Sequence, residues 1–147
     1  MKRRDLEKRL AETPGDRALA ARVGGLCVEL DRGKRALEVL KPLHDHLADL
    51  DEKLRGQVAL DYGIALAMDM QWEKSATVLG EAVPKLPDHA RINEARLAYG
   101  VALVNLGRRT EAREQWQKAA EADPKGRCGE RAREFLKRIS AEPGGKG

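Results

Sequence analysis

Few side chains in this sequence have the types and spacing that catalysis or metal binding requires. His44 and His46 are two residues apart, so on a helix they would point to different sides and could not bind the same metal ion. Cys27 and Cys128 have no paired spacing, which argues against a disulfide framework and against a zinc site. We therefore predict no catalytic residue, no metal ligand and no cofactor site, and hence a protein that is not an enzyme.

One cysteine and one basic segment leave alternatives open. Cys128 is expected at the start of the last helix, where the helix N-terminus could lower the pKa of its thiol. The basic residues of that helix are expected to form a solvated face, with a contact to an acidic partner or a membrane surface as the alternative.

The elements that must position any functional side chain are predicted to be helices. The chain has 147 residues, of which 41% are hydrophobic, 35% charged and 3% aromatic. Strong helix formers dominate and no alternating run indicates a strand, so the predicted fold class is all-α. No apolar run approaches the ~20 residues of a membrane span, and no apolar stretch follows the basic start. We therefore expect a cytoplasmic protein without a membrane span.

The formal net charge of +4 is concentrated at the two ends. Residues 1–10 carry five basic and two acidic side chains, and residues 125–147 carry seven and three, which leaves residues 11–124 at −3. Nucleic-acid binders more often have a continuous basic face with aromatic side chains for base stacking, and this sequence shows neither. Nucleic acid is therefore the weakest partner hypothesis.

The sequence repeats itself. Residues 61–66, DYGIAL, match residues 98–103, AYGVAL, and each copy ends at a proline, Pro87 or Pro124. The pattern resembles the tetratricopeptide repeat family, whose unit of about 34 residues is a pair of antiparallel helices. In the copy that starts at Asn93, the matching residues are Tyr99, Gly100, Leu103, Gly107, Ala112, Trp116, Ala119 and Pro124.

The resemblance implies one domain, residues 1–141, that forms an α-α superhelix of about three helix-turn-helix repeats. The repeats are 17–50, 56–89 and 93–126, preceded by a half repeat at 5–16 and followed by a capping helix at 127–140 and a flexible tail at 142–147. Eight helices are expected at 5–12, 16–31, 33–49, 52–69, 72–85, 89–106, 109–122 and 127–140. Their predicted N-caps include Asp16, Asp51, Asp88 and Thr110.

Small residues at matching positions give a physical reason for the pattern. Two helices approach closely only where small side chains lie at their crossing, and Gly24, Gly63 and Gly100 are expected there. A glycine inside a helix costs about 1 kcal/mol relative to alanine, so three in register indicate a packing requirement. Large side chains are expected to fill the space between the helices, namely Tyr62, Tyr99, Leu40, Leu79 and Trp116.

In the family, the first helix of each repeat lines a concave groove. The resemblance implies that the partner-binding residues here are Ala18, Ala21, Gly25, Val28, Gln57, Leu60, Ile64, Met68, Glu94, Leu97, Val101 and Asn105. The lysine and asparagine residues with which some relatives bind a C-terminal carboxylate are missing. Because the set is mostly apolar, the hypothesis is a groove for an amphipathic helix or an extended peptide. Self-association and burial within the chain are the alternatives.

The function that these features predict is a protein-protein interaction module, an adaptor or a chaperone-like protein that binds a peptide or helix of another protein. A structural subunit of a larger complex or a homo-oligomer is the first alternative, and a nucleic-acid-linked regulator is the weaker one. No small-molecule substrate is expected.

Overall fold

The structure is a computed structural model that describes residues 2–141, and within that range it is helical without a strand. The helices are α1 (Arg3–Glu12), α2 (Arg17–Glu29), α3 (Gly33–Asp45), α4 (Glu52–Met68), α5 (Trp72–Ala82), α6 (Ile92–Asn105), α7 (Arg109–Ala122) and α8 (Arg127–Ala141). Short 3-10 turns follow α3 at Leu47–Asp49 and α5 at Val83–Lys85. The predicted all-α class is therefore confirmed, while the tail expected at 142–147 lies outside the described residues.

Two of the four predicted N-caps are confirmed. The side chain of Asp16 accepts a hydrogen bond from Leu19 N, and that of Asp51 accepts one from Leu54 N. The predicted cap at Asp88 is wrong, because α6 begins only at Ile92. The segment before it forms a turn in which His89 Nδ1 accepts a hydrogen bond from Arg91 N.

The predicted cap at Thr110 is also wrong. The turn between α6 and α7 is so short that α7 already begins at Arg109, which places Thr110 inside the first helical turn. The flanking residue Arg108 makes no side-chain capping bond.

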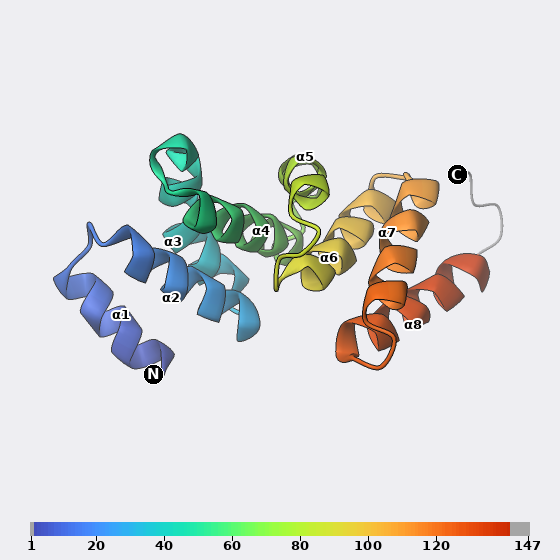
Figure 1. The fold of residues 1–147 in the computed structure, drawn as a ribbon, viewed down its shortest axis with the longest axis horizontal. Coiled ribbons are helices and arrows are strands. Elements are labelled where there is room, and N and C mark those ends of the chain that lie inside the picture. The colour runs from blue at the N-terminus through green and yellow to red at the C-terminus, as the bar shows by residue number, and fades with distance from the viewer. Residues whose placement is uncertain (1, 142–147) are drawn as a thin grey trace.

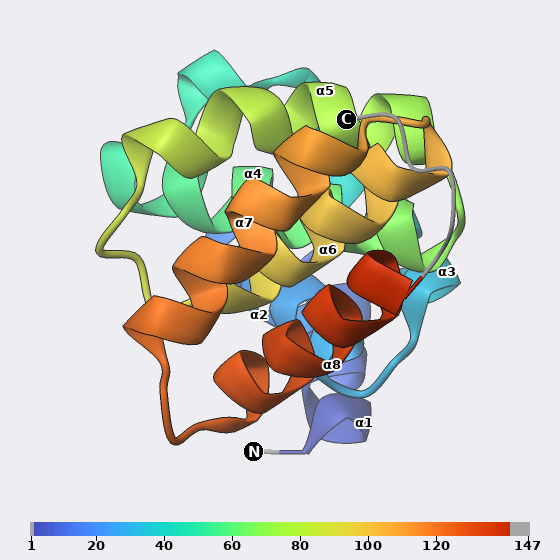
Figure 2. The same ribbon diagram turned by 90° about the vertical axis from the view of Figure 1, so that its right-hand side faces the viewer.

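The helices form two layers along the long axis of the molecule, from α1 at one end to α8 at the other (Figure 1). Helices α2, α4, α6 and α8 contact one another in sequence and form what we call the inner layer. Helices α3, α5 and α7 form the outer layer, each packed against the two inner-layer helices next to it in the chain. Helix α1 packs against α2, and Figure 2 shows the stack from the α8 end.

The three turns from an inner-layer helix to the next outer-layer helix have the same backbone geometry. Each contains one residue in the left-handed region, and the amide after it donates a hydrogen bond to a carbonyl five residues earlier, as in a Schellman motif. The left-handed residues are Asp31 (φ 59°), Met70 (φ 57°) and Gly107 (φ 79°). The bonds are Arg32 N to Cys27 O (2.8 Å), Gln71 N to Leu66 O (2.9 Å) and Arg108 N to Leu103 O (2.9 Å).

The three glycines predicted at helix crossings each face the large side chain predicted to fill the space. A Cβ added at Gly24 would lie 2.5 Å from Leu40 Cγ, and one added at Gly63 would lie 2.5 Å from Leu79 Cγ. At Gly100 it would lie 2.6 Å from Trp116 Cε2, whose indole Nε1 donates a hydrogen bond to Leu97 O. Since carbon atoms do not approach so closely, a side chain at any of the three positions would force its neighbour to shift. The prediction is confirmed for Leu40, Leu79 and Trp116, while Tyr62 and Tyr99 are not among the nearest neighbours of these glycines.

Candidate functional site

The structure distributes the predicted groove residues between the core and the surface. Those that are buried are Ala21, Gly25, Leu60 and Ile64. Those that are partly buried are Val28, Gln57, Met68, Leu97 and Val101. Only Ala18, Glu94 and Asn105 are exposed.

The apolar members of this set belong to the packing between inner-layer helices. Leu60 has no exposed surface and Ile64 only 7%, because α4 lies between α2 and α6 and contacts both. Val28 and Met68 pack against the same cluster as Leu60 and Ile64. A partner therefore cannot reach Leu60 or Ile64 unless the inner layer opens.

What remains accessible on this side of the inner layer is both polar and apolar. We call it the inner-layer face, and its residues are Ala18, Arg22, Val28, Glu29, Gln57, Met68, Arg91, Glu94, Leu97, Val101 and Asn105. A hollow of about 250 Å³ lies in it, between α1, α2, α4 and the start of α6. Arg22, Glu29, Gln57 and Arg91 line this hollow, so it offers both donors and acceptors of hydrogen bonds.

Arg91 is fixed in this hollow by contacts with two inner-layer helices. Its Nε lies 2.9 Å from Oδ1 of Asp61 on α4. Its Nη2 donates a hydrogen bond of 3.0 Å to the carbonyl of Gly25 on α2 and lies 3.0 Å from Oε1 of Glu29. Arg91 thus joins the start of the third helix pair to both the second and the first.

Asp61 is a buried charge inside the inner layer. Its side chain has no exposed surface, and neither of its carboxylate oxygens accepts a well-aligned hydrogen bond in the described part of the chain. Burial raises the pKa of Asp61 to about 6, while the nearby Arg91 opposes the rise. A side chain at Gly25 would collide with this carboxylate, since an added Cβ would lie 2.9 Å from Oδ2.

Asp61 and Arg91 were not among the residues predicted for the site. Asp61 occupies the position that Ala98 has in the matching copy, so a charged residue at an otherwise apolar position was the signal available in the sequence. No comparable signal exists for Arg91, because its contact with Gly25 spans 66 residues of chain.

The cysteines and histidines singled out in the sequence lie apart from the inner-layer face or within the packing. Burial, followed by the nearby Glu94 and Asp123, raises the pKa of the Cys128 thiol, opposite to the direction considered for a helix start. Burial lowers the pKa of His44, whose ring lies 4.6 Å from that of Tyr62. Neither residue has the environment of a reactive group.

Comparisons with models of protein families, with curated proteins and with solved structures gave no significant match. Within residues 2–141, no group of three or more His, Cys, Asp and Glu side chains is placed to hold a metal ion. None of the described helices combines the length and the apolar character needed to cross a bilayer. Since no match indicates a ligand, what the hollow could bind is inferred from the polar side chains that line it.

Proposed function

We propose that the chain is a helical-repeat protein of the tetratricopeptide type that binds a segment of another protein on its inner-layer face. Two repeated features support the family: the three turns with one left-handed residue each, and the three pairs of a glycine with a large side chain. Both recur at matching positions of successive helix pairs, as in repeat proteins built by stacking one supersecondary unit.

The observation that carries the function is the hollow beside Arg22 and Gln57, with Arg91 already held in place at its floor. Because ion pairs and a hydrogen bond order Arg91 before any partner arrives, binding has a smaller entropic cost there. The exposed side chains that line the hollow, Arg22 and Glu29, are charged, so a segment bound there is expected to form hydrogen bonds and charge pairs. This replaces the mostly apolar groove of the sequence-based hypothesis as our proposal for the binding surface.

Site-specific photo-crosslinking in the native cell tests the proposal. A photoreactive residue replaces Arg22 or Gln57 in the hollow, and a matched control carries it at Lys118, which is exposed on the outer-layer helix α7. We expect the same protein to be crosslinked from both positions in the hollow and not from Lys118. Crosslinks only to a second copy of the chain would instead support a homo-oligomer, and no crosslink from the hollow would contradict a binding role for this face.

A further inference from the structure

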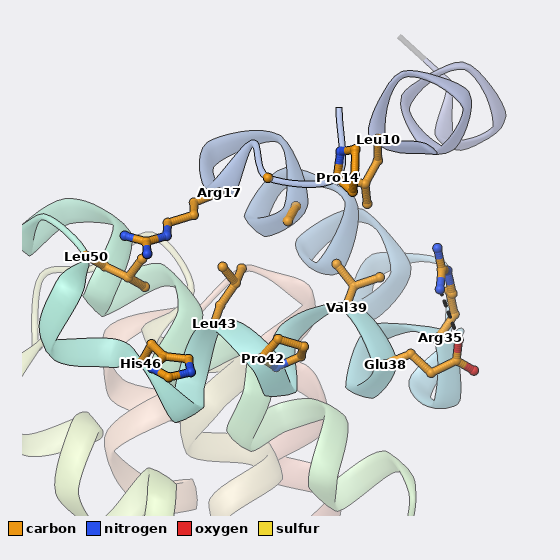
Figure 3. A pocket seen from close by; sticks show the side chains of 12 residues that line it. Leu10, Pro14, Arg17, Arg35, Glu38, Val39, Pro42, Leu43, His46 and Leu50 are labelled. Carbon is orange, nitrogen blue, oxygen red and sulfur yellow. Dashed lines mark hydrogen bonds and ion pairs between the residues drawn. The ribbon is translucent and has the colours of Figure 1, made fainter. Parts of the chain in front are cut away.

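A second hollow lies at the N-terminal end of the molecule and shares no lining residue with the first. It is a groove of about 490 Å³ between α1, the first turn of α2, and α3 (Figure 3). Its floor is formed by the buried side chains of Val39, Leu43 and Leu50, and the exposed rings of Pro14 and Pro42 line it as well. We call it the Pro42 groove.

The groove has the size and the lining of a binding site for apolar side chains. Ligand sites in proteins commonly enclose about 300–1,000 Å³ and are lined mainly by apolar side chains with a few polar groups. Within the described residues, the well-exposed large hydrophobic side chains are Leu30 and Met70, and both stand singly on turns between helices. Neither side chain belongs to an apolar patch that would fill the groove of a second copy.

Pro42 is an unfavourable residue for the interior of a helix. It lies inside α3, where proline has no amide hydrogen to donate, so the carbonyl of Glu38 loses its α-helical partner. Pro42 is exposed, so burial within the chain does not compensate for this loss. Glu38 also lines the groove, and its carboxylate lies 3.0 Å from Arg35 Nη1.

The charged residues of the groove differ at its two ends. At one end, Arg35 is already paired, with its Nη2 2.6 Å from Glu7 Oε1 and its Nη1 3.0 Å from Glu38 Oε2. At the other end, Arg17 donates only a long hydrogen bond of 3.5 Å to the Asp49 carbonyl. No carboxylate among the described residues forms an ion pair with Arg17, whose guanidinium can therefore bind an acidic group.

We propose that the Pro42 groove binds a segment of a partner protein that places a large aliphatic side chain between Pro14 and Pro42 and an acidic side chain against Arg17. The apolar floor and the two prolines select the aliphatic side chain. The Arg17 guanidinium, which has no carboxylate partner among the described residues, selects the acidic one. This surface is separate from the inner-layer face, so it provides a second contact for the same or another partner.

A library of short random peptides displayed on phage tests this proposal, with selection on the purified wild-type chain and counter-selection on Gly15→Trp. Gly15 lines the groove, its φ lies outside the left-handed region, and a Cβ added there meets nothing within 4 Å. The Cβ of the variant therefore meets open space, and the tryptophan serves to obstruct the groove at a residue that lines it. Ala90→Trp is the matched control, since Ala90 is exposed on the turn before α6. Circular dichroism checks that both variants fold.

We expect the enriched peptides to share an aliphatic residue next to an acidic one. Synthetic copies should bind the wild type and Ala90→Trp, fail to bind Gly15→Trp, and lose roughly tenfold in affinity with Arg17→Glu. The charge reversal Lys118→Glu on α7 should leave their affinity unchanged. Pro42→Ala should raise the unfolding temperature and yet weaken binding, a combination that loss of folding cannot produce.

Four results would overturn the proposal. They are the absence of enriched peptides, enriched peptides that bind Gly15→Trp as well as the wild type, affinity that is insensitive to Arg17→Glu, and a lower unfolding temperature for Pro42→Ala. A concentration-dependent dimer in light scattering that is lost in Gly15→Trp would also overturn the proposal, because a second copy of the chain would then occupy the groove.

Discussion

The guanidinium of Arg91 lies 2.9 Å, from Nε to Oδ1, from the carboxylate of Asp61, which has no exposed surface. The pair joins the start of α6 to the middle of α4, and the further contacts of Arg91 with Gly25 and Glu29 extend the connection to α2. A buried ion pair is seldom a net source of stability, because removing two charges from water is costly. We therefore infer that the contacts of Arg91 fix the relative positions of α2, α4 and α6 more than they stabilise the fold.

The buried carboxylate gives the protein a characteristic pH dependence. Burial raises the pKa of Asp61 to about 6 in the folded chain. In the pH interval between its unfolded pKa and about 6, the folded state therefore holds a proton that the unfolded chain has already released. The stability that Asp61 contributes is therefore fully present below its unfolded pKa and is lost as the pH rises through about 6. A rise of about two pH units corresponds to at most roughly 3 kcal/mol.

Urea unfolding of the wild type and of Asp61→Asn over a series of pH values measures this effect. Asparagine does not titrate, so the variant should gain stability relative to the wild type as the pH rises through that interval. Carboxylates elsewhere in the chain titrate equally in both proteins and cancel in the difference. Two curves that remain parallel would show that the pKa of Asp61 is not raised.

Met70 occupies a turn position that favours glycine. Its φ of 57° is strained for a residue with a side chain, and 71% of its surface is exposed, so truncation removes little packing. Met70→Gly should stabilise the fold by about 0.5–1 kcal/mol. The reciprocal variant Gly107→Met, at the matching turn with φ 79°, should destabilise it by a similar amount. Thermal unfolding of both variants checks the prediction, which fails if both shift in the same direction.

Helix α1 is held to α3 by a bidentate ion pair. Arg35 Nη2 lies 2.6 Å from Glu7 Oε1 and Arg35 Nε lies 2.9 Å from Glu7 Oε2, and this pairing lowers the pKa of Glu7. The stabilisation is thus present above the ordinary pKa of a glutamate and is lost as the pH falls through the lowered value. Glu7→Gln should loosen α1 by about 1 kcal/mol, which hydrogen exchange of the α1 amides would detect.

Glu38→Gln is the matched control for this prediction. Glu38 also pairs with Arg35, at 3.0 Å, but both residues lie on α3, and the Glu38 side chain is largely exposed. Its loss should leave the exchange of α1 unchanged. Equal protection of α1 in Glu7→Gln and in the wild type would mean that the ion pair does not hold the helix.

The sequence was sufficient to predict the order of the helices and the pairing of Gly24, Gly63 and Gly100 with large side chains. Both depend on local periodicity and on spacings within one helix pair. It was not sufficient to predict that Leu60 and Ile64 are covered, because repeat position indicates which side a residue faces and not how closely neighbouring helix pairs approach. The Pro42 groove depends in the same way on where α1 lies relative to α3, which no local pattern encodes.

The stacking of equivalent helix pairs is tested most directly by a double-mutant cycle between Gly63 and Leu79, read out as the free energy of unfolding. Because a Cβ at position 63 would lie 2.5 Å from Leu79 Cγ, Gly63→Ala should destabilise the wild type by about 1–3 kcal/mol. In the Leu79→Ala background only Val78 Cγ1, at 3.3 Å, remains close to the added Cβ, and the same substitution should stabilise by up to about 1 kcal/mol through helix propensity. If Gly63→Ala instead stabilises both backgrounds equally, the glycine does not face the next helix and the account of nested helix pairs is contradicted.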